Sequence, residues 1–173
     1  MDSFKHDVPT AGAGQATHQQ CWLASFGMIY KYYKLSSSSI EDKLSGAGID
    51  VATAKSDGML DTDYKTAATA LGLTSLSVPP FKETSFFDFD VSSGAYKFID
   101  ELKKGPLWVS RYIKPGLYHA IVATGYSDDG KGYIIFNNPY PGPSNAKEDT
   151  SVPATLFVRD LTTAKGSVMA YRS

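Results

Sequence analysis

The order of the hydrophobic patterns constrains the fold of this chain more than any other feature. Helical spacing of apolar residues dominates residues 21–104, and short alternating or continuous apolar runs follow Gly105. Helices followed by strands, without regular alternation of the two, indicate an α+β domain with an antiparallel sheet. A chain of 173 residues suits one domain, residues 1–173, with a core that needs no disulfide or metal.

Four helices are expected, after a loop over residues 1–14. The first begins at Cys21 and ends near Lys34, because Leu23, Phe26 and Tyr30 recur on one helix face. The others are expected over residues 38–47, where Ser38 and Glu41 form a capping box, 62–71 and 95–104. Gly72 suits the position after a helix end, and residues 50–59 are expected to form a loop.

Strands are expected over residues 74–78, 107–113, 118–124, 133–137 and 167–171. Three prolines, Pro139, Pro141 and Pro143, predict that pairing stops after the fourth strand, because proline cannot donate a hydrogen bond to a ladder. The segment from there to Pro153 is therefore expected to be a loop. The aromatic residues between 81 and 91 are expected to pack into the core.

Composition excludes several classes of protein. Seventeen basic and 18 acidic residues give a net charge of −1, whereas a nucleic-acid-binding domain is usually strongly basic. One cysteine excludes an internal disulfide and a thiolate-rich zinc site, and His6, His18 and His119 have no zinc-like spacing, so no metal or cofactor is expected. No run reaches the roughly 18 apolar residues of a membrane span, and no signal peptide is recognised. We therefore expect action in a cytosol or export by a specialised route.

Cys21 stands where a polar loop becomes the first helix. A thiol on the first turn of a helix faces unpaired N–H groups and the positive end of the helix dipole. Both favour the thiolate, which is the nucleophilic form. The alternative is a structural cysteine, since free cysteine is often buried and inert.

A thiol nucleophile needs a base, and the base needs a third group that holds its ring. His119, beside a Pro-Gly turn, is the candidate base, and a core histidine is the alternative. Asn137 and Asn138 lie one hairpin further along, and strand alternation allows only one of them to meet His119. The backbone N–H of Cys21 and a glutamine side chain are candidate donors to an oxyanion.

Four blocks of this sequence resemble papain-like cysteine proteases. They are Gln15 with Cys21-Trp-Leu-Ala-Ser25, Gly105-Pro-Leu-Trp-Val109, His119-Ala-Ile-Val-Ala-Thr-Gly125 and Asn138-Pro139. The resemblance is strongest to compact bacterial members, namely avirulence-effector proteases secreted into plant cells and the peptidase domains that trim double-glycine leaders. Leu23 departs from the small residue usual there, and Asn138 stands where these members more often have Asp.

The resemblance implies a papain-like fold, in which an N-terminal helical half packs on a C-terminal antiparallel sheet around an active-site cleft. It implies a triad of Cys21, His119 and Asn138, with Gln15 in the oxyanion hole. The implied activity is cleavage of protein or peptide substrates, as a secreted bacterial effector or toxin domain. Trp22 and Trp108 are candidates for the wall of the substrate cleft, and burial in the core is the alternative for both.

Two further interpretations stay open. A papain-fold amidase, deamidase or transglutaminase uses the same residues on other carbonyl groups, because fold and triad do not choose the substrate. A non-catalytic binding module is the other, although a module without chemistry has no need for Gln15, Cys21 and His119 together. An inhibitor or immunity protein as partner is an expectation that rests on the resemblance alone.

Overall fold

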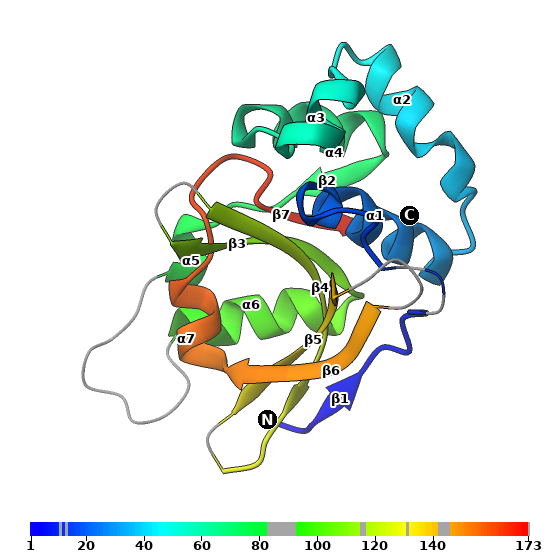
Figure 1. The fold of residues 1–173 in the computed structure, drawn as a ribbon. Coiled ribbons are helices and arrows are strands. Elements are labelled where there is room, and N and C mark those ends of the chain that lie inside the picture. Colours follow the sequence, from blue (N-terminus) through cyan, green and yellow to red (C-terminus); the bar gives the residue numbers. More distant parts are fainter. Residues whose placement is uncertain are drawn as a thin grey trace.

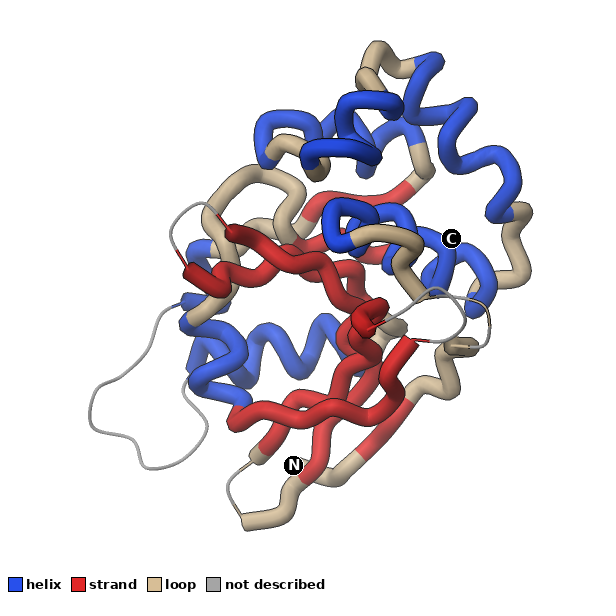
Figure 2. Tube along the Cα trace, in the orientation of Figure 1, coloured by secondary structure: helices blue, strands red, loops and turns tan. Residues whose placement is uncertain are grey.

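The computed structural model describes residues 1–10, 12, 14–82, 93–114, 117–130, 132–141 and 146–172. Within these ranges, an antiparallel seven-stranded sheet has helices on both of its faces (Figures 1 and 2). The α+β class with helices ahead of most strands is therefore confirmed. The strands are β1 (Phe4–Lys5), β2 (Leu73–Ser75), β3 (Leu107–Lys114), β4 (Leu117–Ser127), β5 (Tyr133–Pro141), β6 (Ala146–Pro153) and β7 (Val168–Tyr171).

The helices divide between the two faces of the sheet (Figure 1). One group consists of α1 (Cys21–Tyr32), α2 (Ile40–Gly46), α3 (Val51–Asp57) and α4 (Tyr64–Ala70), with the short 3-10 turns η1 (His18–Gln20), η2 (Ser37–Ser39) and η3 (Asp61–Asp63). The other group consists of α5 (Pro79–Lys82), α6 (Ser93–Lys103) and α7 (Ala154–Arg159). The resemblance implied helices on one face of the sheet only. The second group, α5 to α7, covers the other face as well.

The strand order is β2-β7-β3-β4-β5-β6, and β1 pairs with β4 outside this path. Alternate residues of the central strands supply two separate cores, because successive side chains point to opposite faces. Trp108, Ala120 and Val122 belong to the core beneath α1 to α4. Leu107 and Ile121 belong to the core beneath α5 to α7. Apolar residues on both faces explain why β3 and β4 have continuous apolar runs.

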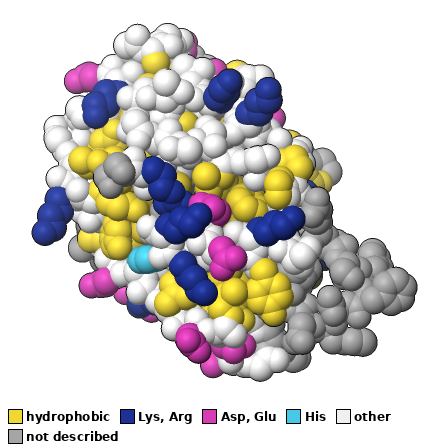
Figure 3. Space-filling model, turned by 180° about the vertical axis from the view of Figure 1, so that it is seen from behind, with side chains coloured by type: hydrophobic (Ala, Val, Ile, Leu, Met, Phe, Trp, Pro, Cys, Tyr) yellow, Lys and Arg dark blue, Asp and Glu magenta, His cyan; other side chains and the backbone are white. Residues whose placement is uncertain are grey.

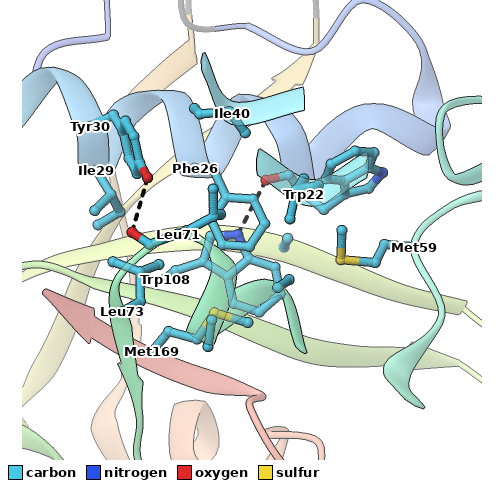
Figure 4. Close-up of a cluster of buried hydrophobic side chains, with 14 of the residues drawn as sticks. Trp22, Phe26, Ile29, Tyr30, Ile40, Met59, Leu71, Leu73, Trp108 and Met169 are labelled. Atoms are coloured by element: carbon cyan, nitrogen blue, oxygen red, sulfur yellow. Dashed lines mark hydrogen bonds between the residues drawn. The ribbon is translucent and has the colours of Figure 1, made fainter. Parts of the chain in front are cut away.

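The core beneath α1 is built on aromatic side chains (Figure 4). Trp108 stacks on Phe26 with ring centroids 5.0 Å apart, and its indole N–H donates to the carbonyl oxygen of Trp22. Tyr30 donates its hydroxyl hydrogen to the carbonyl oxygen of Leu71. These bonds satisfy the polar atoms of the large rings and fix the position of α1 on the sheet.

The prediction of a loop over residues 50–59 is wrong. Residues 51–57 form α3, and Asp50 caps this helix by accepting a hydrogen bond from the backbone N–H of Thr53. Residues 79–82 form the short helix α5, which was not expected. The capping box at Ser38 does not form, since η2 occupies residues 37–39 and α2 begins at Ile40 without a side-chain cap. Gly72 does adopt the left-handed conformation expected after a helix end, with φ of 67°.

The loop expected between residue 138 and Pro153 is also wrong. Strand β5 continues to Pro141, and β6 pairs with it along most of its length. The pairing of β5 with β6 is irregular around the prolines, with register shifts between Phe136 and Asn138 and between Asn138 and Pro141. Expectations that fall on the aromatic residues 83–91 and on Pro143 lie outside the described residues.

Basic and acidic side chains are interspersed on the face shown in Figure 3, in keeping with the small net charge. None of the helices in the described ranges has the length and apolar character that crossing a membrane requires. The described residues also contain no group of three His, Cys, Asp or Glu side chains arranged for a metal ion.

Candidate active site

Cys21 is the first residue of α1 and follows directly on η1. The residue is 8% exposed, and its sulfur accepts a hydrogen bond of 3.4 Å from the backbone N–H of Ala120 on β4. Ala120 follows His119, so the candidate nucleophile on α1 contacts the strand that carries the candidate base. The structure therefore brings residues 99 positions apart in the chain to one place.

Burial raises the pKa of the Cys21 thiol, although the backbone N–H groups of Ala120, Trp22 and Cys21 lower it. The expectation that the helix start alone favours the thiolate is therefore corrected. The N–H groups at the helix end act as expected, but loss of hydration of the charged sulfur has the larger effect. A thiolate at neutral pH thus needs a further stabilising charge, such as a protonated imidazole.

His119 on β4 and Asn138 on β5 form a hydrogen bond of 2.7 Å between the ring Nε2 and the side-chain Oδ1. The same side-chain atom of Asn138 also accepts a hydrogen bond from the backbone N–H of Tyr140 at 3.0 Å. It is therefore the amide oxygen and not the amide nitrogen, and the ring hydrogen of His119 is on Nε2. The neutral ring then has an unprotonated Nδ1, the atom that a general base requires. Among the described residues the sulfur accepts no hydrogen bond from His119.

Burial lowers the pKa of His119, the bond to Asn138 raises it, and the nearby positive charge of Arg111 lowers it further. The ring is therefore neutral over a wider range of pH than an exposed histidine. Burial thus disfavours the charged form of each side chain taken separately, and a thiolate–imidazolium pair would offset this cost through the attraction between its two charges.

Asn137 and Asn138 have different partners, in keeping with the expectation that only one of them meets His119. Its side-chain amide donates to the carbonyl oxygen of Val8, and its Oδ1 accepts the backbone N–H of Asp149. Of the two asparagines, Asn138 is the one that hydrogen-bonds His119. Asn137 instead links β5 to the N-terminal segment and to β6 through its hydrogen bonds.

Two contacts join the segment before Cys21 to the end of β5. The backbone N–H of Gln15 donates to the carbonyl oxygen of Pro139, and the His18 ring stacks on the Tyr140 ring with centroids 5.6 Å apart. The segment that carries Gln15 is thus fixed against the strand that carries Asn138.

The side chain of Gln15 is buried, and its Nε2 donates to the carbonyl oxygen of Thr17 at 2.9 Å. An amide nitrogen carries two hydrogens, so one donor remains for another acceptor. Its Oε1 is buried, and no described residue hydrogen-bonds it. Gln19, by contrast, lines the cleft beside Cys21.

A cleft of about 320 Å³ opens beside Cys21. One part of its wall comes from residues 57–61, from the end of α3 to the start of η3, and another from Leu117, Tyr118 and Ala120 on β4. Tyr64 also lines the cleft, and its hydroxyl hydrogen-bonds the Ser110 hydroxyl at 3.1 Å. Burial raises the pKa of Tyr64 to about 12, so its hydroxyl stays neutral.

The two tryptophans have different positions. Trp22 is 2% exposed but borders the cleft, and its indole N–H donates to the carbonyl oxygen of Ala54 on α3. Trp108 is 0% exposed and is not among the residues that line the cleft. Trp108 therefore supports the site from beneath, between Phe26 and Tyr64.

Two features near the site were not anticipated from the sequence. The wall at residues 57–61 falls in the segment expected to be loop, and no local pattern marks it as part of a cleft. Arg111 lies directly opposite His119 in the β3–β4 ladder. The sequence did contain a signal for Arg111, because this charged residue interrupts an apolar strand at the same distance from the Pro-Gly turn expected at residues 114–116 as His119.

The model of one protein family, described as papain-like cysteine protease AvrRpt2, matches residues 2–152. This range includes Gln15, Cys21, His119 and Asn138, and most of the sheet. The search of curated proteins gave no match.

Proposed function

Since the chain belongs to the papain-like cysteine protease AvrRpt2 family and is a cysteine protease, we propose that it cuts protein substrates through Cys21, His119 and Asn138. The observation that supports this assignment is a pair of hydrogen bonds near the start of β4. The sulfur of Cys21 accepts a hydrogen bond from the backbone N–H of Ala120, and the ring of the neighbouring His119 is hydrogen-bonded to the side chain of Asn138. These contacts support the assignment of Cys21 as the nucleophile, His119 as the base and Asn138 as the group that orients the base.

In the proposed reaction the S–H bond of Cys21 breaks, and its proton moves to Nδ1 of His119. The sulfur attacks the carbonyl carbon of the peptide bond and forms a tetrahedral intermediate. His119 then gives the proton to the leaving amine as the C–N bond breaks. Water, activated by the same imidazole, releases the acyl group from the sulfur and restores the thiol.

The tetrahedral oxyanion needs donors that point at it before the reaction begins. The backbone N–H of Cys21 lies at the start of α1, where no intrahelical acceptor uses it. Gln15 supplies the second donor through the amide hydrogen that Thr17 does not bind. Its attachment to Pro139 keeps this amide in place relative to the triad.

The cleft suits an extended segment of a protein with an apolar side chain close to the bond that is cut. Met59, Leu60 and Tyr118 supply apolar surface, and Asp57 and Asp61 supply acidic groups at the wall. His119 is not among the lining residues, yet the leaving amine must reach it. We therefore place the acyl part of the substrate in this cleft and the leaving part beyond it. The family resemblance supports an effector that acts on proteins of another organism.

The test is incubation of the protein with a peptide library, followed by mass spectrometry of the products. Cleavage is expected for the natural sequence and at most a trace for Cys21→Ala and His119→Ala. Release of ammonia from glutamine with no new peptide ends would refute the endopeptidase assignment and support a deamidase. Activity that survives in Cys21→Ala would refute the assigned nucleophile.

A further inference from the structure

A second cavity, of about 340 Å³, adjoins the cleft beside Cys21. Asp61 and Tyr118 line both spaces, so the second cavity continues the cleft along the surface of the molecule. Its other lining residues are Lys82, Tyr112 and residues 161–164. Cys21 lines the cleft and is not among the residues of the second cavity, which therefore lies farther from the reacting sulfur.

Two tyrosine rings form an aromatic wall of this cavity. Tyr112 on β3 and Tyr118 on β4 lie directly opposite each other in the ladder, with ring centroids 6.2 Å apart. Each of the two residues is 42% exposed. Exposed aromatic surface that is continuous with a binding cleft is typical of a recognition site, because tyrosine supplies much of the binding energy at protein contacts.

The wall at residues 161–164 is held in place by hydrogen bonds. The backbone N–H of Thr162 donates to the carbonyl oxygen of Ser110 at 3.2 Å, and Nζ of Lys82 donates to the carbonyl oxygen of Leu161 at 2.8 Å. The cavity thus has its shape before a ligand binds, as binding sites usually do. Its charged residues, Lys82 and Asp61, have opposite signs, so the lining attracts neither cations nor anions on balance.

The second cavity lies on the acyl side of the proposed reaction. His119, which gives its proton to the leaving amine, is hydrogen-bonded to Asn138 on β5. Tyr112 belongs to β3, and β4 lies between β3 and β5 in the sheet. The leaving part of a substrate therefore extends toward β5, and the acyl part continues from the cleft past Tyr118 to Tyr112.

We propose that this cavity, called the tyrosine subsite, binds an aromatic side chain of the substrate. This side chain belongs to the acyl part and lies farther from the cut bond than the side chain in the cleft. The inference rests on the proposed function. The planes of the Tyr112 and Tyr118 rings are inclined by 58°, so a third ring can contact the face of one and the edge of the other.

The test measures kcat/KM for peptides that carry Phe, Ser, Lys or Glu at one position at a time on the acyl side of the cut bond. At one position beyond the residue in the cleft, we expect the natural protein to favour Phe over Ser by at least about tenfold. This ratio is expected to fall close to one in Tyr112→Ser and to persist in Tyr112→Phe, which keeps the ring.

Tyr96→Ser is the matched control, because Tyr96 is 39% exposed on α6 and lines neither the cleft nor the tyrosine subsite. It is expected to keep the ratio of the natural protein. Absence of an aromatic preference at every such position, or a preference that survives in Tyr112→Ser, would overturn the proposal. A preference for Lys that is lost in Asp61→Asn, or for Glu that is lost in Lys82→Gln, would also overturn it, because charge would then select the side chain.

Binding of the same peptides to the full chain carrying Cys21→Ala separates this proposal from the proposed function. Fluorescence anisotropy of labelled peptides gives Kd without cleavage, and the Phe peptide is expected to bind at least about tenfold more tightly than the Ser peptide. Absence of cleavage by the natural protein would refute the proposed function. Equal Kd values for the two peptides would refute the tyrosine subsite.

Discussion

Asn137 and Asn138 are adjacent in sequence, and exchanging each for alanine is expected to have opposite consequences. Asn138 contacts the ring of His119, whereas Asn137 is 3% exposed and bonded to the backbone of Val8 and Asp149. We expect Asn138→Ala to lower turnover with a small effect on stability, and Asn137→Ala to lower stability with a small effect on turnover.

The magnitudes follow from the bonds that each change removes. Asn137→Ala leaves a buried carbonyl oxygen and a backbone N–H without partners, at a cost of about 2–4 kcal/mol in the free energy of unfolding. In a domain of this size that corresponds to a fall of roughly 5–15 °C in Tm. Asn138→Ala frees the His119 ring to turn, and we expect kcat/KM to fall about 10–100-fold, equivalent to roughly 1.4–2.7 kcal/mol in transition-state stabilisation.

The assay measures kcat/KM on a cleaved peptide at a temperature where both variants are folded, together with thermal unfolding of each. Asn138→Asp serves as the conservative variant, since a carboxylate also accepts the Nε2 hydrogen, and most activity is expected to remain. Loss of turnover in Asn137→Ala with full activity in Asn138→Ala would refute the assigned facing of β5.

Three further predictions concern the thiol, the cleft wall and the core. Because burial raises the pKa of Cys21, its alkylation at pH 6 is expected to be at least about tenfold slower in His119→Ala than in the natural protein, and equal rates would mean that the imidazole takes no proton from the thiol. Hydrogen bonds from Thr53 lower the pKa of Asp50, so the carboxylate stabilises α3 at neutral pH and this stabilisation is lost as the pH falls through the lowered value. Thermal unfolding should therefore show a lower Tm for Asp50→Ala at pH 7 and no difference in strong acid, and a constant difference would contradict the capping role. Trp108→Ala is expected to cost about 3–5 kcal/mol, measured by denaturant unfolding, with the preferred cleavage sequence unchanged, whereas a changed preference would place Trp108 in contact with substrate.

Local patterns predicted the elements whose faces are clearly apolar. The helix that begins at Cys21 and strands β3 and β4 are readable because their apolar residues recur with the spacing of the element. Helix α3 was missed because its residues carry no such stripe, and its cap at Asp50 was read as part of a loop. Strand β6 was missed because its run of charged residues followed by polar ones, close to prolines, resembles a loop, whereas pairing with β5 stabilises it as a strand.

The sequence by itself determined the class of the fold and the chemical groups available for catalysis. A single thiol at a helix start, a histidine on the first long hairpin and an asparagine one hairpin later are properties of the chain, independent of packing. Only the tertiary structure decided the charge states and the neighbours of these groups. Burial by distant segments outweighs the local effect of the helix end on Cys21, and strand pairing places Arg111 beside His119. Hydration and electrostatic fields depend on everything within several ångströms, and that set of neighbours exists only after the helices and the sheet have packed together.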